Sequence, residues 1–131
     1  YTVKGMNFAF AGLLTAVEKL KGRASNEDVC FSAQETAFSM LVEACERALC
    51  HTNNPGLLLC GGNARNKRLA EMLRLMCSEH NVRFCVTPDE HSGDAGAMIA
   101  YTGLVMLKHK AVPRDKKPSQ KMRLDNQEIK W

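Results

Sequence analysis

The sequence lacks several patterns that would assign it quickly to a functional class. Its 131 residues contain no Cys-x-x-Cys pair and no His-x-x-x-His pair, so the usual zinc-binding spacings are missing. Nothing resembles a Ser-His-Asp set or a nucleophile elbow. No apolar run reaches the roughly 18–20 residues that a membrane-spanning helix needs, so we expect no membrane partner.

What the sequence does contain is an ordinary globular balance, with 45% hydrophobic and 24% charged residues. This composition excludes disordered and fibrous chains, and the length corresponds to one domain. The chain opens on Tyr-Thr-Val-Lys-Gly without a Met, which suggests a piece of something larger. Its six cysteines form no framework, so we expect free, mostly buried thiols in a reducing compartment. A cytoplasmic location follows as an expectation.

Positive charge gathers near the end of the chain. Residues 108–123 hold seven Lys or Arg and one Asp, whereas the remainder is slightly acidic. A basic, Pro-containing segment attracts RNA or an acidic partner, although a solvated surface segment has the same composition. We predict that residues 1–111 form a folded lobe and residues 112–131 a basic tail.

Hydrophobic spacing predicts the elements of the first half. Alternation of Met6, Phe8 and Phe10 predicts a short strand, and residues 13–20 look helical. Ser25 or Asn26 is expected to cap a long helix that ends at the Asn-Asn-Pro-Gly break of residues 53–56. One face of this helix should be buried: Phe38, Leu41, Val42, Cys45, Ala48 and Leu49.

The second half predicts two strands that alternate with two helices. The wholly apolar run 57–60 is typical of a buried strand, and residues 82–86 form a second one. Between them lies a helix with a stripe of Leu69, Met72, Leu73 and Met76. Residues 94–108 form a helix of small and apolar residues that should be buried on most sides. This order predicts an α/β fold, with short parallel strands packed by helices.

The first candidate site is the pair Gly61-Gly62, which follows a strand and precedes a helix. Glycine allows a ligand to approach the backbone closely, and a helix start offers N–H donors to an anion or nucleotide. We expect Asn66 in the first turn of that helix, where its amide could donate to and accept from a ribose or base. A tight turn whose glycines serve packing is an equally good interpretation of the bare motif.

The second candidate is Asp94, which precedes the helix of small residues. An ordinary N-cap aspartate, stabilising by about 1 kcal/mol, is one interpretation. A metal-binding carboxylate at the mouth of a cleft is the other, and both can hold because a carboxylate has several lone pairs. Ligands of open α/β sheets lie outside the carboxyl ends of the strands. Gly61-Gly62 and Asp94 both follow such ends.

These two segments carry a resemblance to a known family. Residues 61–69, Gly-Gly-Asn-Ala-Arg-Asn-Lys-Arg-Leu, and residues 94–103, Asp-Ala-Gly-Ala-Met-Ile-Ala-Tyr-Thr-Gly, resemble the universal tRNA N6-threonylcarbamoyladenosine transferases. This family includes the catalytic subunit of the KEOPS complex and has also been called O-sialoglycoprotein endopeptidase or glycoprotease. Segments 3–6, 34–38, 41–43 and 122–131 look like it too. The resemblance therefore runs almost from end to end.

The resemblance implies the C-terminal lobe of an actin-like ATPase (ASKHA) superfold. It implies transfer of a threonylcarbamoyl group from its adenylate to the N6 amine of a tRNA adenosine, with the adenylate or ATP bound at Gly61, Gly62 and Asn66. It implies one divalent metal, iron or zinc, for which Asp94 matches the late Asp ligand. The family's histidine pair is absent from this chain, so the chain alone should be inactive. Expected partners are tRNA, KEOPS-type subunits with a partner kinase, and a second copy of the lobe; the nucleus is a further expected location.

Four positions depart from the family pattern. Asn63 stands where the family usually has Val, Ala95 where it has Asn, and Ala9 and Ala11 where it has Ser. The lost hydroxyl and amide groups would remove hydrogen bonds near the expected cleft. An alternative function therefore stays open: a non-catalytic lobe that docks tRNA or a partner kinase. The name endopeptidase finds no support in these residues, because the sequence contains no nucleophile arrangement and no complete metal site.

Overall fold

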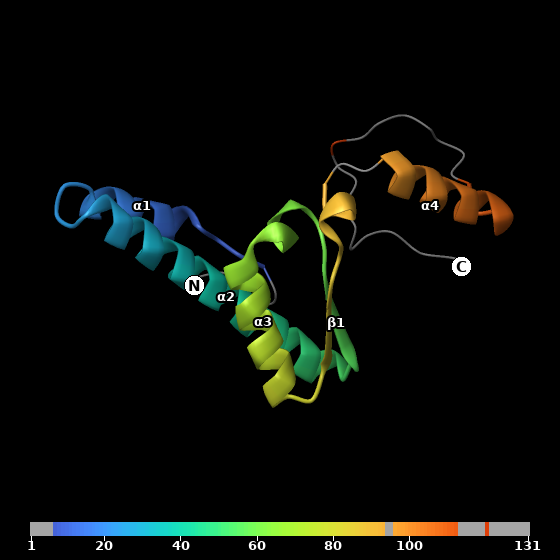
Figure 1. The fold of residues 1–131 in the computed structure, drawn as a ribbon, viewed down its shortest axis with the longest axis horizontal. Coiled ribbons are helices and arrows are strands. Elements are labelled where there is room, and N and C mark those ends of the chain that lie inside the picture. The colour runs from blue at the N-terminus through green and yellow to red at the C-terminus, as the bar shows by residue number, and fades with distance from the viewer. Residues whose placement is uncertain (1–6, 94–95, 113–119, 121–131) are drawn as a thin grey trace. The chain divides into compact units, whose positions relative to one another are not determined.

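A computed structural model describes residues 7–93, 96–112 and 120 of the chain (Figure 1). The chain divides into two compact units, Tyr1–Ser92 and Gly93–Trp131, which are described separately. The predicted boundary between a lobe of residues 1–111 and a tail of residues 112–131 stays a prediction, since most of that tail lies outside the described residues.

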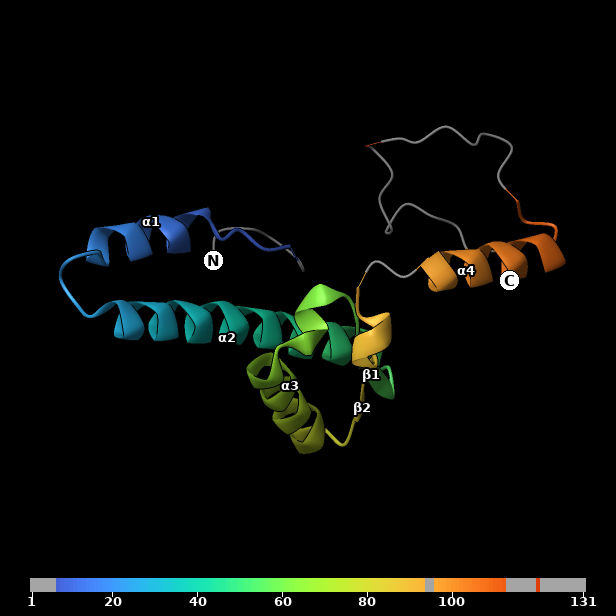
Figure 2. The ribbon, with the colours of Figure 1, turned by 45° about the horizontal axis from the view of Figure 1, so that its top comes forward.

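Two helices form the amino-terminal part of the first unit. α1 (Ala11–Leu20) lies alongside the first half of the long helix α2 (Asn26–Thr52), as Figure 2 shows. Ser25 is the N-cap of α2, as predicted, and its Oγ accepts a hydrogen bond from the N–H of Asp28 at 3.1 Å. α2 ends at Asn53, which adopts a left-handed conformation (φ 50°) and donates its N–H to the carbonyl of Leu49 at 2.8 Å.

The strand predicted around Phe8 is wrong for the described residues 7–10, which have no strand structure. Met6 lies outside the described residues. Instead, the rings of Phe8 and Phe10 stack on each other, with centroids 5.9 Å apart, and α1 begins directly after them. A strand needs a neighbour to pair its N–H and C=O groups, and no described residue pairs with this segment. Alternating hydrophobicity alone was therefore insufficient to predict a strand in this segment.

The centre of the first unit is a β-α-β arrangement. β1 (Gly56–Leu59) pairs with β2 (Arg83–Val86) in parallel, with Leu57 opposite Phe84 and Leu59 opposite Val86. The connection contains a 3-10 turn, η1 (Gly62–Arg65), and the helix α3 (Lys67–Glu79). The predicted α/β class with parallel strands is confirmed as a small two-stranded sheet.

Helices cover one face of this sheet. Leu49 of α2 and four residues of α3 form the buried core, and they contact the inward side chains of both strands; the α3 residues are Leu69, Leu73, Met76 and Cys77. The predicted stripes of α2 and α3 are therefore confirmed as core-facing. The prediction of a buried strand at residues 57–60 is wrong in part, because burial alternates along β1 and Leu58 remains 63% exposed. Among the described residues, no helix or strand buries the side chain of Leu58 on that face of the sheet.

All six cysteines are free, as predicted, but only Cys77 is buried. Desolvation raises the pKa of the buried Cys77 thiol and that of the half-buried Cys45 thiol, which packs against the same core. A raised pKa lowers the thiolate fraction, so neither sulfur is a good nucleophile. The expectation of mostly buried thiols is wrong, because four of the six lie on exposed faces.

In the second unit the described helix is α4 (Gly96–Lys108). It has no buried residue, and Ile99, Tyr101, Leu104 and Leu107 are each more than 60% exposed. The prediction that this helix is buried on most sides is therefore wrong for the chain by itself, since burial requires a covering layer as well as an apolar composition. None of the helices in the described part of the chain is long and apolar enough to cross a membrane.

Candidate functional site

The ends of β1 and β2 bring two loops together. Because the strands are parallel, both continue into loops at the same edge of the sheet, and Figures 1 and 2 show η1 and the short turn η2 (Asp89–His91) at that end. We call residues 60–66 and 87–92 together the carboxyl edge. Ligands of open α/β sheets bind at such edges.

The two predicted glycines form an open turn within the carboxyl edge. Gly61 has φ 86° and ψ 178°, a conformation that side-chain-bearing residues rarely adopt. Gly62 begins η1, and a Cβ added at either glycine would meet no atom within 4 Å. These glycines are therefore not required by packing within the described structure. Open space beside a glycine backbone is what a bound ligand would need.

Asn66 lies one position before α3, not in its first turn as predicted. It is the N-cap, and its Oδ1 accepts hydrogen bonds from the N–H groups of Arg68 at 3.0 Å and Leu69 at 3.2 Å. Both lone pairs of that oxygen are thereby used, so Asn66 can offer a ligand only its Nδ2 donors. The prediction that this amide both donates and accepts is corrected accordingly.

The same cap changes where an anion could bind. The N–H of Ala70 donates to the carbonyl of Asn66 at 3.1 Å, so three N–H groups at the start of α3 already have acceptors inside the protein. The expected donors for an anion at this helix start are therefore largely occupied. The backbone of the Gly61-Gly62 turn is the better candidate, because its surroundings are open.

Hydrogen bonds fix the second loop of the carboxyl edge. The N–H of Thr87 donates to the carbonyl of Leu59 at 2.9 Å, which continues the strand pairing. Ser92 is fully buried, and its hydroxyl lies 3.0 Å from the carbonyls of both Thr87 and Pro88. The loop thus folds around one serine side chain.

An arginine connects the two loops. Nη2 of Arg65 donates to the carbonyl of Asp89 at 2.6 Å, joining residues 24 positions apart. Neither Arg65 nor Ser92 was a predicted site residue. Their partners are backbone carbonyls, which leave no signature in the sequence.

A second arginine holds the start of α3 against α2. The guanidinium of Arg68 donates to both carboxylate oxygens of Glu35, with Nε 2.8 Å from Oε1 and Nη2 2.7 Å from Oε2. Its Nη1 donates to Glu71 at 2.9 Å. Hydrogen bonds from Arg68 lower the pKa of Glu35, and the carboxylates of Glu35 and Glu71 raise that of Arg68. Glu35 and Arg68 therefore both stay charged near neutral pH.

Asp94, the predicted metal ligand, lies outside the described residues. Within the described part of the chain, no group of three or more His, Cys, Asp or Glu side chains is arranged to hold a metal ion.

Comparison with known proteins decides the family. The family model for tRNA N6-adenosine threonylcarbamoyltransferase matches residues 1–101, more than three quarters of the chain. The chain belongs to this transferase family. The resemblance inferred from residues 61–69 and 94–103 is thereby confirmed.

Three curated relatives show what the chain is similar to. The chain is 49% identical, over its whole length, to a probable bifunctional tRNA threonylcarbamoyladenosine biosynthesis protein of Methanothermobacter thermautotrophicus, of which it covers 25%. It is also 49% identical over its whole length to the tRNA N6-adenosine threonylcarbamoyltransferase of Archaeoglobus fulgidus, covering 42% of it. For the Methanothrix thermoacetophila transferase, identity is 56% over 82% of this chain and 33% of the relative. The chain thus spans a quarter to two fifths of these relatives' length.

The Glu35–Arg68 pair predicts how stability varies at acid pH. Because the folded pKa of Glu35 is lowered, its contribution is fully present above the unfolded value of about 4.3 and is lost as the pH falls through the folded pKa. We expect wild type to be more stable than Glu35→Gln at neutral pH and to lose this advantage below about pH 4. Urea midpoints of both proteins across this range measure the effect. A difference that does not change with pH would contradict it.

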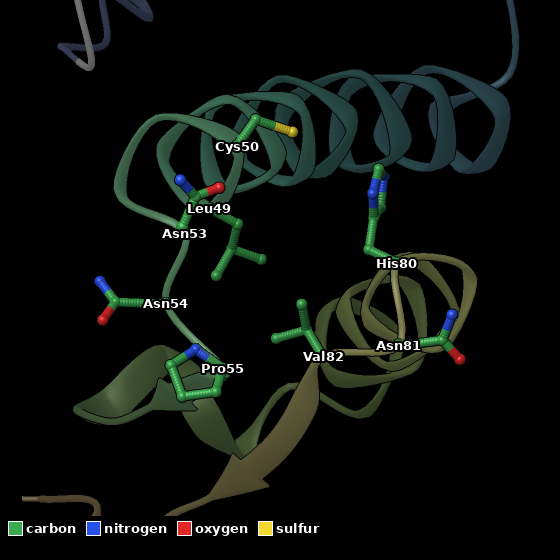
Figure 3. Close-up of a pocket in the computed structure, with 8 residues that line it drawn as sticks. All are labelled: Leu49, Cys50, Asn53, Asn54, Pro55, His80, Asn81 and Val82. Atoms are coloured by element: carbon green, nitrogen blue, oxygen red, sulfur yellow. The ribbon is translucent and has the colours of Figure 1, made fainter.

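The hollows of the first unit do not coincide with the carboxyl edge. A cavity of about 330 Å³ lies at the opposite end of the strands, where α2 and α3 end and the chain enters β1 and β2 (Figure 3). Leu49 and Val82 form its apolar part, and Asn53, His80 and Asn81 its polar rim. Nε2 of His80 lies 2.6 Å from Oε1 of Glu46, tying α3 to α2 here as well. Ligands of open α/β sheets lie at the other edge, outside the carboxyl ends of the strands.

Proposed function

We propose that this chain forms the C-terminal part of a tRNA N6-adenosine threonylcarbamoyltransferase with an actin-like fold. The family match over residues 1–101 carries the proposal. The position of the Gly61-Gly62 turn at the carboxyl edge supports it, because a nucleotide can approach that backbone without a steric clash.

In the proposed reaction, the N6 amine of a tRNA adenosine attacks the carbamoyl carbon of threonylcarbamoyl adenylate. The new C–N bond replaces the C–O bond to the phosphate, the amine loses a proton, and AMP leaves. The role of this chain is to hold the nucleotide half of the substrate. The N–H groups of Gly61 and Gly62 face the phosphate or ribose, and Nδ2 of Asn66 donates to an acceptor of the ribose or base.

Asp94 would supply one carboxylate ligand to an iron or zinc ion. Its partner ligands in this proposal are the histidine pair of the family, which this chain does not contain. When bound, the metal would polarise the carbamoyl group as a Lewis acid. ATP in place of the adenylate, KEOPS-type subunits with a kinase, and a cytoplasmic or nuclear location also belong to this proposal.

The basic segment around residues 108–123 favours one alternative, a non-catalytic lobe that docks tRNA. Removing residues 112–131 separates a tRNA-binding tail from a structural one. If the tail binds tRNA, its loss weakens binding and reduces the dependence of binding on salt.

The decisive experiment joins this chain to the part that the relatives possess and the chain lacks. In a chimera, the chain replaces the matching 42% of the Archaeoglobus fulgidus transferase, and transfer of radiolabelled threonylcarbamoyl to tRNA is measured. We expect transfer by the chimera and none by the isolated chain. Asp94→Ala should reduce the rate by at least about a hundredfold, as loss of a metal ligand does.

Asp89→Ala is the matched control. Asp89 is an exposed aspartate earlier in the chain, and it contacts Arg65 through its backbone carbonyl rather than through its carboxylate. A chimera without any transfer would favour the docking alternative, with Asn63 and Ala95 as the first positions to restore. Equal activity of the two variants would remove Asp94 from the proposal.

A further inference from the structure

The ion pair between Glu35 and Arg68 joins the middle of α2 to the first turn of α3. Its two parallel hydrogen bonds, 2.8 and 2.7 Å long, connect residues 33 positions apart. The side chains are 23% and 42% exposed, so water screens the pair and its contribution to folding stability is small. A two-pronged contact between arginine and carboxylate nevertheless fixes both distance and direction.

The backbone of the same arginine holds Asn66. The N–H of Arg68 donates to Oδ1 of Asn66 at 3.0 Å, and the N–H of the next residue, Leu69, donates to it at 3.2 Å. Leu69 is anchored in the core, with 3% exposure, whereas the exposed side chain of Arg68 is held by Glu35 of α2 and Glu71 of α3. A shift of Arg68 would therefore turn the amide of Asn66 directly.

Of the two carboxylates that bind this guanidinium, only Glu35 lies on α2. Glu71 also binds Arg68, at 2.9 Å, but it belongs to α3 itself, three residues further on. It orients the guanidinium without connecting two elements. The Glu35 contact is thus the one in this cluster that joins α3 to α2 close to Asn66.

We propose that Glu35 and Arg68 are positioning residues that aim Nδ2 of Asn66 at the nucleotide. The inference rests on the proposed function, because it gives the pair a role in substrate binding beyond stability. Neither side chain touches the substrate. Their effect passes through the cap of α3, so loss of the pair should weaken nucleotide binding and leave the chemical step largely unchanged.

Glu35→Gln in the chimera tests this role. Glutamine keeps the shape of the side chain but leaves one acceptor oxygen in place of two, so the two-pronged contact is lost. We expect KM for threonylcarbamoyl adenylate to rise about tenfold while kcat changes less than about twofold. The melting temperature should fall by only a few degrees, since water screens the exposed pair.

Glu71→Gln is the matched control, because it removes one carboxylate from the same guanidinium without separating α2 from α3. Its KM should stay within about twofold of wild type. The reversed pair, Glu35→Arg with Arg68→Glu, restores a contact between the helices and should recover most of the lost affinity.

The outcomes separate the inference from the proposed function. If the wild-type chimera does not transfer at all, the proposed function fails. If it transfers, and Glu35→Gln has the KM of wild type or of Glu71→Gln, the positioning role is wrong. A loss of kcat and melting temperature in Glu35→Gln that the reversed pair does not restore would also overturn it, since the role would then be structural.

Discussion

Replacing Leu73 with alanine is expected to destabilise the first unit by about 2–5 kcal/mol. Leu73 is 2% exposed and lies in the core between α2, α3 and the sheet, with Leu69 and Met76 beside it on the same helix. Truncation removes buried apolar surface and leaves a cavity that the surrounding side chains fill only in part. Since domains of this size are stable by only about 5–15 kcal/mol, the loss is a large share of the total.

Leu75→Ala is the control for this prediction. The two leucines lie on the same helix, but Leu75 is 59% exposed, so the same chemical change should shift stability by no more than about 0.5 kcal/mol. Urea unfolding followed by far-UV circular dichroism measures both variants. Equal losses would show that α3 does not pack as the structure has it.

Alanine substitutions at the two neighbouring glycines are expected to have different effects, on folding stability at Gly61 and on nucleotide binding at Gly62. At Gly61 the backbone conformation, φ 86° and ψ 178°, is strained for any residue with a Cβ, so Gly61→Ala should cost about 1–3 kcal/mol of stability. At Gly62 no atom lies within 4 Å of an added Cβ, so the fold should tolerate alanine. If the nucleotide lies on this turn, the new methyl group would instead collide with it.

Gly62→Ala should therefore weaken nucleotide binding by at least about tenfold, equivalent to 1.4 kcal/mol, without loss of stability. Adenylate binding to the chimera, measured by calorimetry, and urea unfolding give the two readouts. Unchanged binding in a stable Gly62→Ala protein would place the nucleotide elsewhere. Unchanged stability in Gly61→Ala would mean that the turn can rearrange.

Local patterns predicted much of the first unit. The cap at Ser25, the stop at Asn53 and the stripe that contains Leu69 and Leu73 are confirmed, because each depends on neighbours within a few residues. Parallel pairing of β1 and β2 also followed from element order, since a strand–helix–strand connection returns the chain in the same direction. The site residues Gly61 and Gly62 lie at the carboxyl edge for the same reason.

Burial was predicted less well. The strand expected at residues 6–10 has no pairing partner among the described residues, Leu58 faces outward, and α4 is exposed. Each prediction took an apolar composition as proof of a covering layer. In a chain that spans a quarter to two fifths of its relatives, that layer can belong to the remaining sequence.

The sequence by itself determined the family, the cap and the stop of α2 and the place of the glycine turn after β1, because these depend on short, contiguous patterns. The tertiary structure decided which atoms of the carboxyl edge remain available. In the structure, Oδ1 of Asn66 accepts hydrogen bonds at the start of α3 and is not free for a ligand. Arg65 contacts Asp89, and Glu35 contacts Arg68. The last two contacts bridge 24 and 33 residues, and such pairs leave no periodic signal because the fold alone brings them together.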